Sequence, residues 1–151
     1  MRKRSNKEIM DNNSTVPREY YSKDYKNQIL ELKASGLLKR FANSRKNLEK
    51  DIHRPLYHAT SPECAMHDAN GLCFYKGRWH LFYQAYPPEH PKQHWGHLVS
   101  DDLIHWKDLP YAIYPGPESA CFSGATLVED DRVIAMYHGT TRGNMVAVSD
   151  D

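Results

Sequence analysis

One carboxylate lies at the junction of a predicted turn and a predicted strand. Asp68 belongs to the stretch Met66-His67-Asp68-Ala69-Asn70-Gly71-Leu72. There Asn-Gly predicts a tight turn, and the apolar residues after it predict a strand. An Asp just before a strand can simply organise the turn through local hydrogen bonds. It can also point its carboxylate into a pocket, and the stretch alone leaves both interpretations open.

Three other short stretches carry side chains suited to binding a sugar. They are Phe82-Tyr83-Gln84, Trp95-Gly96-His97 and Cys121-Phe122-Ser123-Gly124, each at a predicted strand end or turn. Gln, Ser, Trp and His form directional hydrogen bonds to hydroxyls, while an aromatic face stacks on the apolar side of a sugar ring. Taken singly, each stretch is also compatible with core packing.

The sequence does not indicate a metal centre or an organic cofactor. His94 and His97 are close in sequence, but no carboxylate or third ligand is suitably placed beside them. Cys64, Cys73 and Cys121 are far apart and include no Cys-x-x-Cys pair. We therefore predict no metal site.

Composition bounds the class of protein. The 151 residues are enough for one ordinary domain, and no stretch approaches the roughly 20 apolar residues of a membrane-spanning helix. The basic start is not followed by the apolar run of a secretory signal. An odd number of cysteines, widely spaced, favours a reducing environment. We therefore expect a cytoplasmic protein that does not enter membranes; its oligomeric state is not indicated.

Charge divides the chain into two regions. Residues 1–50 hold 13 Lys/Arg against 6 Asp/Glu, a net +7, and residues 51–151 hold 7 against 13, a net −6. This asymmetry predicts two regions with different roles. The basic region is interpreted as a helical hairpin packed on the main domain. A nucleic-acid-binding arm is the alternative, but no aromatic interleaving or recognised motif supports nucleic acid as a partner.

The basic region is predicted to contain a flexible tail, residues 1–21, and a helical segment, residues 22–50. Gly36 is expected to stop the first helix, and a second helix of about three turns follows it. The apolar residues at helical spacing are Tyr25, Ile29 and Leu32 in the first helix and Leu37, Leu38, Phe41 and Leu48 in the second.

From Arg54 onward, short aromatic and branched runs alternate with turn signals, as in all-β proteins. A weak repeat of about 50 residues, the size of a propeller blade, is present in this part. The repeated pairs are Gly71 and Gly124, Tyr83 and Tyr137, and Ser100 and Ser149. The second copy stops at Asp150-Asp151, before the Leu and Trp found in the first. Since an unclosed ring leaves sheet edges unpaired, we expect residues 54–151 to be the N-terminal part of a longer propeller.

These stretches resemble glycoside hydrolase family 32, which includes invertases, sucrose-6-phosphate hydrolases, levanases and inulinases. The resemblance covers about residues 54–151 and consists of six motifs in the family's order and spacing. They are Arg54-Pro55-Leu56-Tyr57-His58, Met66 to Leu72, Phe82-Tyr83-Gln84, Trp95-Gly96-His97, Ser100-x-Asp102-Leu103-x-x-Trp106 and Phe122-Ser123-Gly124.

The resemblance implies an all-β fold, a five-bladed β-propeller whose first blade and part of the second are present here after a short helical segment. It implies hydrolysis of β-fructofuranosyl bonds with retention of configuration, without a metal or an organic cofactor, on a small carbohydrate substrate. Asp68 corresponds to the family's nucleophile. The residues that correspond to, or neighbour, positions binding the fructosyl unit are Met66, His67, Gln84, Trp95, Phe122 and Ser123.

A retaining glycosidase needs a second carboxyl group about 5 Å from the nucleophile as acid and base. Glu118, Glu129 and Asp130 do not match the family's acid/base motif. We therefore expect this group and a stabilising Asp to lie beyond residue 151, and the 151 residues alone to be inactive.

Three positions around Asp68 depart from the family pattern. His67 replaces the usual Asn, Ala69 the usual Pro, and Ala65 the usual Trp. His67 can still donate a hydrogen bond to a sugar hydroxyl, with a charge that depends on pH. These changes leave substrate choice open. They motivate the alternative of a non-catalytic sugar-binding propeller or a related enzyme for another glycoside.

Overall fold

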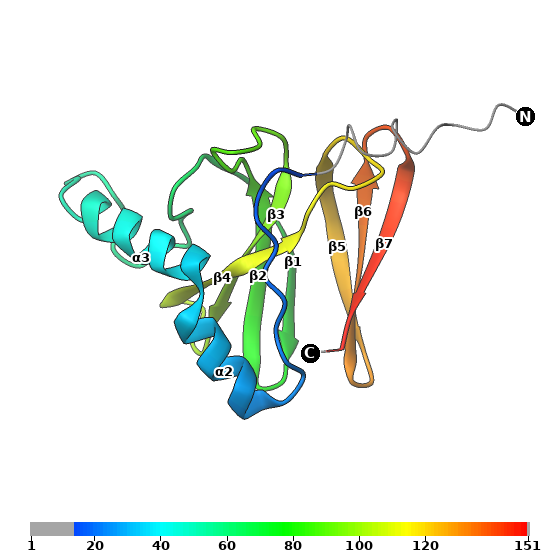
Figure 1. The fold of residues 1–151 in the computed structure, drawn as a ribbon, viewed down its shortest axis with the longest axis horizontal. Coiled ribbons are helices and arrows are strands. Elements are labelled where there is room, and N and C mark those ends of the chain that lie inside the picture. The colour runs from blue at the N-terminus through cyan, green and yellow to red at the C-terminus, as the bar shows by residue number, and fades with distance from the viewer. Residues whose placement is uncertain (1–13, 151) are drawn as a thin grey trace, which may run out of the picture.

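The computed structural model describes residues 14–150 and shows two small β-sheets with a helical segment along one side (Figure 1). The helices are α2 (Tyr25–Ala34) and α3 (Gly36–Leu48). The strands are β1 (Met66–Tyr75), β2 (Arg78–Ala85), β3 (His94–Ser100), β4 (Trp106–Ile113), β5 (Cys121–Glu129), β6 (Arg132–Gly139) and β7 (Gly143–Ser149).

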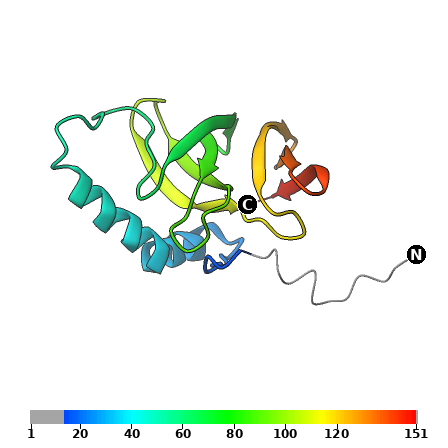
Figure 2. The ribbon, with the colours of Figure 1, turned by 90° about the horizontal axis from the view of Figure 1, so that it is seen from above.

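The sheets have the arrangement of successive propeller blades. One contains antiparallel strands in the order β1-β2-β3-β4, and the other in the order β5-β6-β7. Their first strands, β1 and β5, lie against each other where the sheets meet (Figures 1 and 2). The repeat found in the sequence is thus the repeat of strands β1-β2-β3 in β5-β6-β7, and the all-β propeller prediction with a short helical N-terminal segment is confirmed.

The start of β1 differs from its prediction. Asp68 is the third residue of β1 rather than a residue before it, and Asn70-Gly71 forms no tight turn. The pairing register with β2 shifts on both sides of Ala69-Asn70, and Gly71 has a φ of +60°. Asn-Gly is therefore used in a β-bulge, which a glycine at positive φ permits. The tight turn of this hairpin is Lys76-Gly77, where both residues have positive φ.

The break between the helices is also placed differently. Gly36 does not stop α2; it is the first residue of α3. Ser35, with extended backbone angles, closes α2 and caps α3 by accepting a hydrogen bond from the Leu38 amide. The Glu19 carboxylate accepts hydrogen bonds from the Gly36 and Leu37 amides. Its negative charge at the start of α3 also interacts favourably with the positive end of the helix dipole. No helix within residues 14–150 is long and apolar enough to cross a bilayer.

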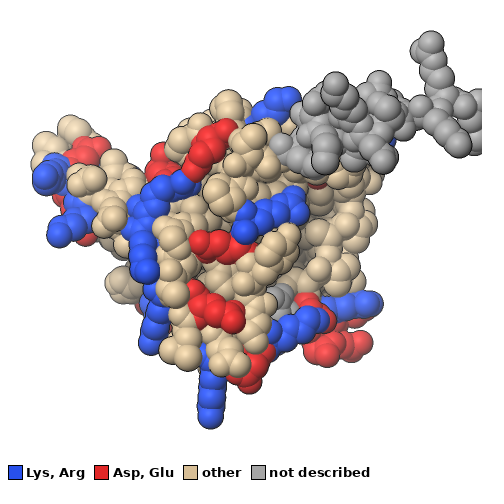
Figure 3. All heavy atoms as spheres, in the orientation of Figure 1, with Lys and Arg blue, Asp and Glu red and all other residues tan. Residues whose placement is uncertain are grey.

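Helix α3 packs on the outer strand of the first sheet. The Phe41 ring meets the Tyr111 ring edge-on, with centroids 5.5 Å apart. Arg45 makes a two-point ion pair with Asp108 of β4, including Nη2–Oδ1 at 2.7 Å. Arg40 pairs with Glu63 and Glu89. Some of the positive charge on this side of the molecule (Figure 3) is therefore neutralised within the fold.

The predicted domain boundaries, 1–21, 22–50 and 54–151, stay predictions. Residues 1–13, most of the predicted flexible tail, lie outside the described residues. Within residues 14–21, Val16 is buried in the same core cluster as Phe41. The amide of Ser14 donates to the carbonyl of Pro115 at 3.1 Å. This short stretch therefore contacts the sheet as well as the helices.

Strand β4 was not predicted from the sequence. It contains Pro110, which has no amide hydrogen to donate. Proline is tolerated at the edge of a sheet, and β4 is the edge strand of the first sheet. Pro110 therefore weakens the strand signal in the sequence. Because β4 lies at the edge of the sheet, the strand forms nonetheless.

His94 is a fully buried histidine that joins β3 to the N-terminal segment. Its Nε2 lies 2.6 Å from Ser14 Oγ, and its Nδ1 lies 2.8 Å from the Lys92 carbonyl oxygen. The rings of Tyr111 and Tyr114 pack beside it. Burial lowers the pKa of His94 to about 4.

This pKa makes folding stability depend on pH. In the unfolded chain the pKa of a histidine is about 6.5, so below pH 6.5 the unfolded state binds the proton that the folded state excludes. The contribution is present above pH 6.5 and is lost as the pH falls toward 4. Between pH 7.5 and 5 the free energy of unfolding should fall by about 2 kcal/mol through His94. Urea denaturation at both pH values should show a smaller fall in the free energy of unfolding for His94→Gln. His53→Gln, at an exposed site, is the control and should show the same fall as the unaltered chain. Equal pH slopes for His94→Gln and the unaltered chain would contradict this assignment.

Candidate active site

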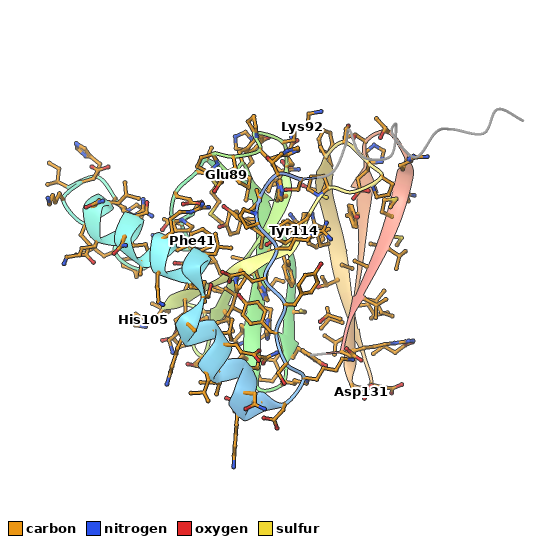
Figure 4. All side chains as sticks on the ribbon, in the orientation of Figure 1. Phe41, Glu89, Lys92, His105, Tyr114 and Asp131 are labelled. Atoms are coloured by element: carbon orange, nitrogen blue, oxygen red, sulfur yellow. The ribbon has the colours of Figure 1, made fainter. Side chains whose placement is uncertain are left out.

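Three of the predicted site residues meet where β1 and β5 begin. Asp68 is near the start of β1 and Ser123 near the start of β5. Gln84 is near the end of β2, which runs antiparallel to β1. All three therefore lie at one end of the two sheets. The β2–β3 connection, with Glu89 and Lys92, is at that end, and Asp131 in the β5–β6 turn is at the other (Figure 4).

The Asp68 carboxylate is held by side chains and stays exposed. Ser123 Oγ donates a hydrogen bond to Asp68 Oδ2 at 2.9 Å. Gln84 Nε2 donates to Ser123 Oγ at 2.8 Å and lies 3.5 Å from the same carboxylate oxygen. Among residues 14–150, nothing hydrogen-bonds to Asp68 Oδ1. The carboxylate is thus oriented through one oxygen, while the other is open to a ligand.

Gln84 and Trp95 form the buried support of this cluster. Gln84 is buried, and Trp95 is completely buried. The indole Nε1 of Trp95 donates to the carbonyl oxygen of Phe122 at 2.9 Å. This bond fixes the backbone just before Ser123, while the Phe122 ring itself is 37% exposed. Trp95 therefore supports the site from below, and Phe122 is accessible at its surface.

The bulge in β1 brings the two blades close enough for this contact. A Cβ added at Gly71 would lie 2.9 Å from Thr126 Cγ2 and 3.0 Å from the Phe82 ring. Thr126 Oγ1 donates to the carbonyl oxygen of Gly71 at 2.7 Å. Thr126 was missed in the sequence, although it follows Ser123 on the same strand by three residues.

Met66 and His67 are adjacent at the start of β1 but lie in different surroundings. The exposed His67 ring packs against Tyr86 with centroids 4.6 Å apart, and its Nδ1 lies 3.3 Å from the Tyr86 hydroxyl. Gln93 Nε2 donates to that hydroxyl at 2.7 Å. Met66 is half-buried and packs against the larger core cluster. Tyr86 and Gln93 were not predicted as site residues.

The other carboxylates considered in the second blade do not belong to this cluster. Glu129 pairs with Arg132 at the far end of β5, about 20 Å from Ser123 at a rise of about 3.3 Å per residue. Asp130 lies in the turn beyond it with a positive φ. Glu118 is buried and accepts a hydrogen bond from Tyr137 at 2.7 Å.

The histidines considered as metal ligands have other surroundings. His97 Nε2 lies 2.9 Å from His80 Nδ1, and burial lowers the pKa of His97 to about 3. His94 is bonded to Ser14, as described above. Within residues 14–150 no group of three metal-ligating side chains is assembled.

A cavity in the described part of the chain does not coincide with the Asp68 cluster. It has a volume of about 890 Å³ and lies between the two sheets, with His80, His97 and Val133 in its walls. Of the seven predicted site residues, only Trp95 lines this cavity. Its one carboxylate, Glu19, accepts hydrogen bonds from the first amides of α3, so the cluster at the strand ends is the stronger candidate for chemistry.

Comparison with known proteins agrees with this arrangement. Residues 58–150, more than half of the chain, match the model of the glycosyl hydrolases family 32 N-terminal domain. The chain belongs to glycoside hydrolase family 32. The match contains all seven predicted site residues, but it does not test their individual roles.

Two curated relatives in family 32 show how much of the family the chain spans. A levanase of Bacillus subtilis is 40% identical over 89 residues, which are 58% of this chain and 13% of the levanase. A sucrose-6-phosphate hydrolase of Zymomonas mobilis is 43% identical over 90 residues, 56% of this chain and 18% of the hydrolase. The chain therefore spans less than a fifth of the length of either relative.

A solved family 32 structure extends the similarity to the fold. The β-fructofuranosidase of Bombyx mori superposes with a TM-score of 0.61 at 35% identity. The superposition covers 79% of this chain and 28% of the silkworm enzyme.

Substituting Gly71 tests whether the bulge and the close contact between the blades require a glycine at this position. Gly71→Ala places a side chain at positive φ and against Thr126, so we expect the free energy of unfolding to fall by about 1–3 kcal/mol. Gly116→Ala is the matched control, because a Cβ there meets nothing within 4 Å. Urea denaturation measures both, and a Gly71→Ala chain as stable as the control would contradict the close contact between the blades.

Proposed function

We propose that this chain carries the nucleophile of a retaining glycosidase that cleaves β-fructofuranosyl bonds. The observation that carries the proposal is the exposed Asp68 carboxylate, held through one oxygen by Ser123. A nucleophilic carboxylate must be ionised and correctly aimed. One charge-assisted hydrogen bond from Ser123, backed by Gln84, orients it and leaves Oδ1 for the substrate.

In the proposed reaction, Asp68 attacks the anomeric carbon of a bound fructosyl unit. The bond to the leaving-group oxygen breaks, and a second carboxyl group gives that oxygen its proton. Water, deprotonated by the same second group, then releases fructose from Asp68 and restores the carboxylate. Asp68 forms and then releases the covalent bond, and Ser123 and Gln84 hold its side chain in position.

The substrate class follows from the family. Family 32 relatives include proteins named levanase, sucrose-6-phosphate hydrolase and fructan β-fructosidase. Solved relatives have been captured with sucrose and with fructosylnystose. We therefore propose a small fructoside, either sucrose, sucrose 6-phosphate or a short fructan. The polar groups Gln84, Ser123 and His67 suit its hydroxyls.

A non-catalytic sugar-binding propeller is the second candidate. Ala65, Ala69 and His67 surround Asp68 and differ from the family pattern. Such a protein would bind the fructoside through the same polar groups without forming a bond to it.

Replacing the carboxylate distinguishes the two candidates. In the protein expressed from its complete reading frame, Asp68→Asn should abolish fructose release from sucrose or a fructan, because an amide is not a nucleophile here. Asp130→Asn is the matched control, since Asn tolerates the positive φ of that turn. Fructose release at the unaltered rate by Asp68→Asn would refute the nucleophile assignment. Binding of sucrose without hydrolysis by the unaltered protein would favour the second candidate.

The 151-residue polypeptide expressed alone should release no fructose. Of the acidic residues considered for acid/base catalysis, Glu129 and Asp130 lie at the far end of β5 and Glu118 is buried. A retaining mechanism needs its two carboxyl groups about 5 Å apart. An assay for fructose with sucrose and with a short fructan checks this expectation, and turnover by this polypeptide would show that an acid/base within it had been overlooked.

A further inference from the structure

His67 is held by two residues outside the predicted site. Tyr86 directly follows β2 and Gln93 directly precedes β3, so both ends of the β2–β3 connection reach the start of β1. The Tyr86 hydroxyl contacts His67 Nδ1 at 3.3 Å, and Gln93 Nε2 contacts that hydroxyl at 2.7 Å. The Gln93 carbonyl oxygen accepts from the Cys121 amide at 2.8 Å, which fixes Gln93 to the start of β5.

The hydrogen bonds around Tyr86 indicate where the imidazole proton lies. The amide nitrogen of Gln93 can only donate, so the Tyr86 oxygen accepts from it. The single hydroxyl hydrogen of Tyr86 is then available to His67 Nδ1. A neutral imidazole that accepts at Nδ1 carries its hydrogen on Nε2. Among residues 14–150, nothing hydrogen-bonds to His67 Nε2.

We propose that Gln93 and Tyr86 are positioning residues that fix His67 in its Nε2–H form beside Asp68. Held in this way, His67 presents one donor to an oxygen of the ligand. The ring cannot rotate to present Nδ1 without losing the Tyr86 contact. The inference of the tautomer uses the described contacts alone, whereas its effect on substrate rests on the proposed function.

The His67 ring is exposed, so its tautomer would not be fixed without the contact from Tyr86. An exposed neutral histidine in water exchanges its hydrogen between the two nitrogens, so only a fraction of molecules would offer Nε2–H. Asp68 Oδ1 and the acceptor Nδ1 cannot donate to a sugar oxygen, and Ser123 Oγ and Gln84 Nε2 already donate within the cluster. A fixed donor at His67 therefore adds a function that the Asp68 cluster lacks.

Nitrogen NMR of the histidine rings tests the tautomer directly. In the ¹⁵N-histidine-labelled protein from the complete reading frame, at a pH where His67 is neutral, the Nε2–H form should dominate. The signal that disappears in His67→Gln identifies the residue. Tyr86→Phe keeps the ring packing and removes the hydroxyl, so it should give a mixture of tautomers. Gln93→Glu replaces the donor with an acceptor, so the Tyr86 hydroxyl should turn to it and His67 should shift toward Nδ1–H.

Tyr21→Phe is the matched control, because it removes a tyrosine hydroxyl that donates to Glu19 in the helical segment. It should leave the His67 signals unchanged. An Nδ1–H form or an even mixture in the unaltered protein would overturn the proposal. So would a tautomer that stays the same in both Tyr86→Phe and Gln93→Glu.

Kinetics with sucrose links the tautomer to the proposed function. Tyr86→Phe should raise KM about two- to tenfold with kcat changed less than about twofold, as expected when one neutral hydrogen bond to substrate is weakened. An unchanged KM alongside a changed tautomer would remove the link to substrate. If Asp68→Asn also left hydrolysis intact, the proposed function would fail while the NMR result for His67 stood independently.

Discussion

The hydrogen bond from Ser123 to Asp68 depends on how closely β1 and β5 approach each other. That approach requires a glycine at position 71, since Thr126 and Phe82 occupy the space where a Cβ would lie. It also uses the bulge, which turns Asp68 toward β5 while the rest of β1 continues its pairing with β2. Packing between blades and chemistry at the strand ends are thus set by the same few residues.

Much of the architecture follows from local sequence patterns. Short aromatic and branched runs between turn signals predict an all-β fold, and the repeat of about 50 residues predicts two similar blades. The resemblance to family 32 implies that Asp68, Gln84 and Ser123 share a site, and hydrogen bonds of 2.8 and 2.9 Å link their side chains. Their roles in catalysis and binding stay predictions, as does that of Met66, which packs into the core.

What local patterns missed depends on contacts between distant parts of the chain. Asn70-Gly71 has the composition of a turn, but pairing with β2 on both sides makes it a bulge. Gly36 has the composition of a helix stop, but Glu19 and Ser35 cap α3 at that point. Tyr86 and Gln93 are separated by a loop, so no periodicity relates them to His67. Each outcome is decided by a tertiary hydrogen bond rather than by propensity.

The most direct test concerns the bond that Asp68 is proposed to form. The protein from the complete reading frame would be mixed with sucrose, quenched rapidly in acid and digested, and its peptides examined by mass spectrometry. The account predicts a hexosyl adduct on the peptide that contains Asp68, at the side-chain carboxylate, and none when glucose replaces sucrose. Active hydrolysis with the adduct on another carboxylate would contradict it.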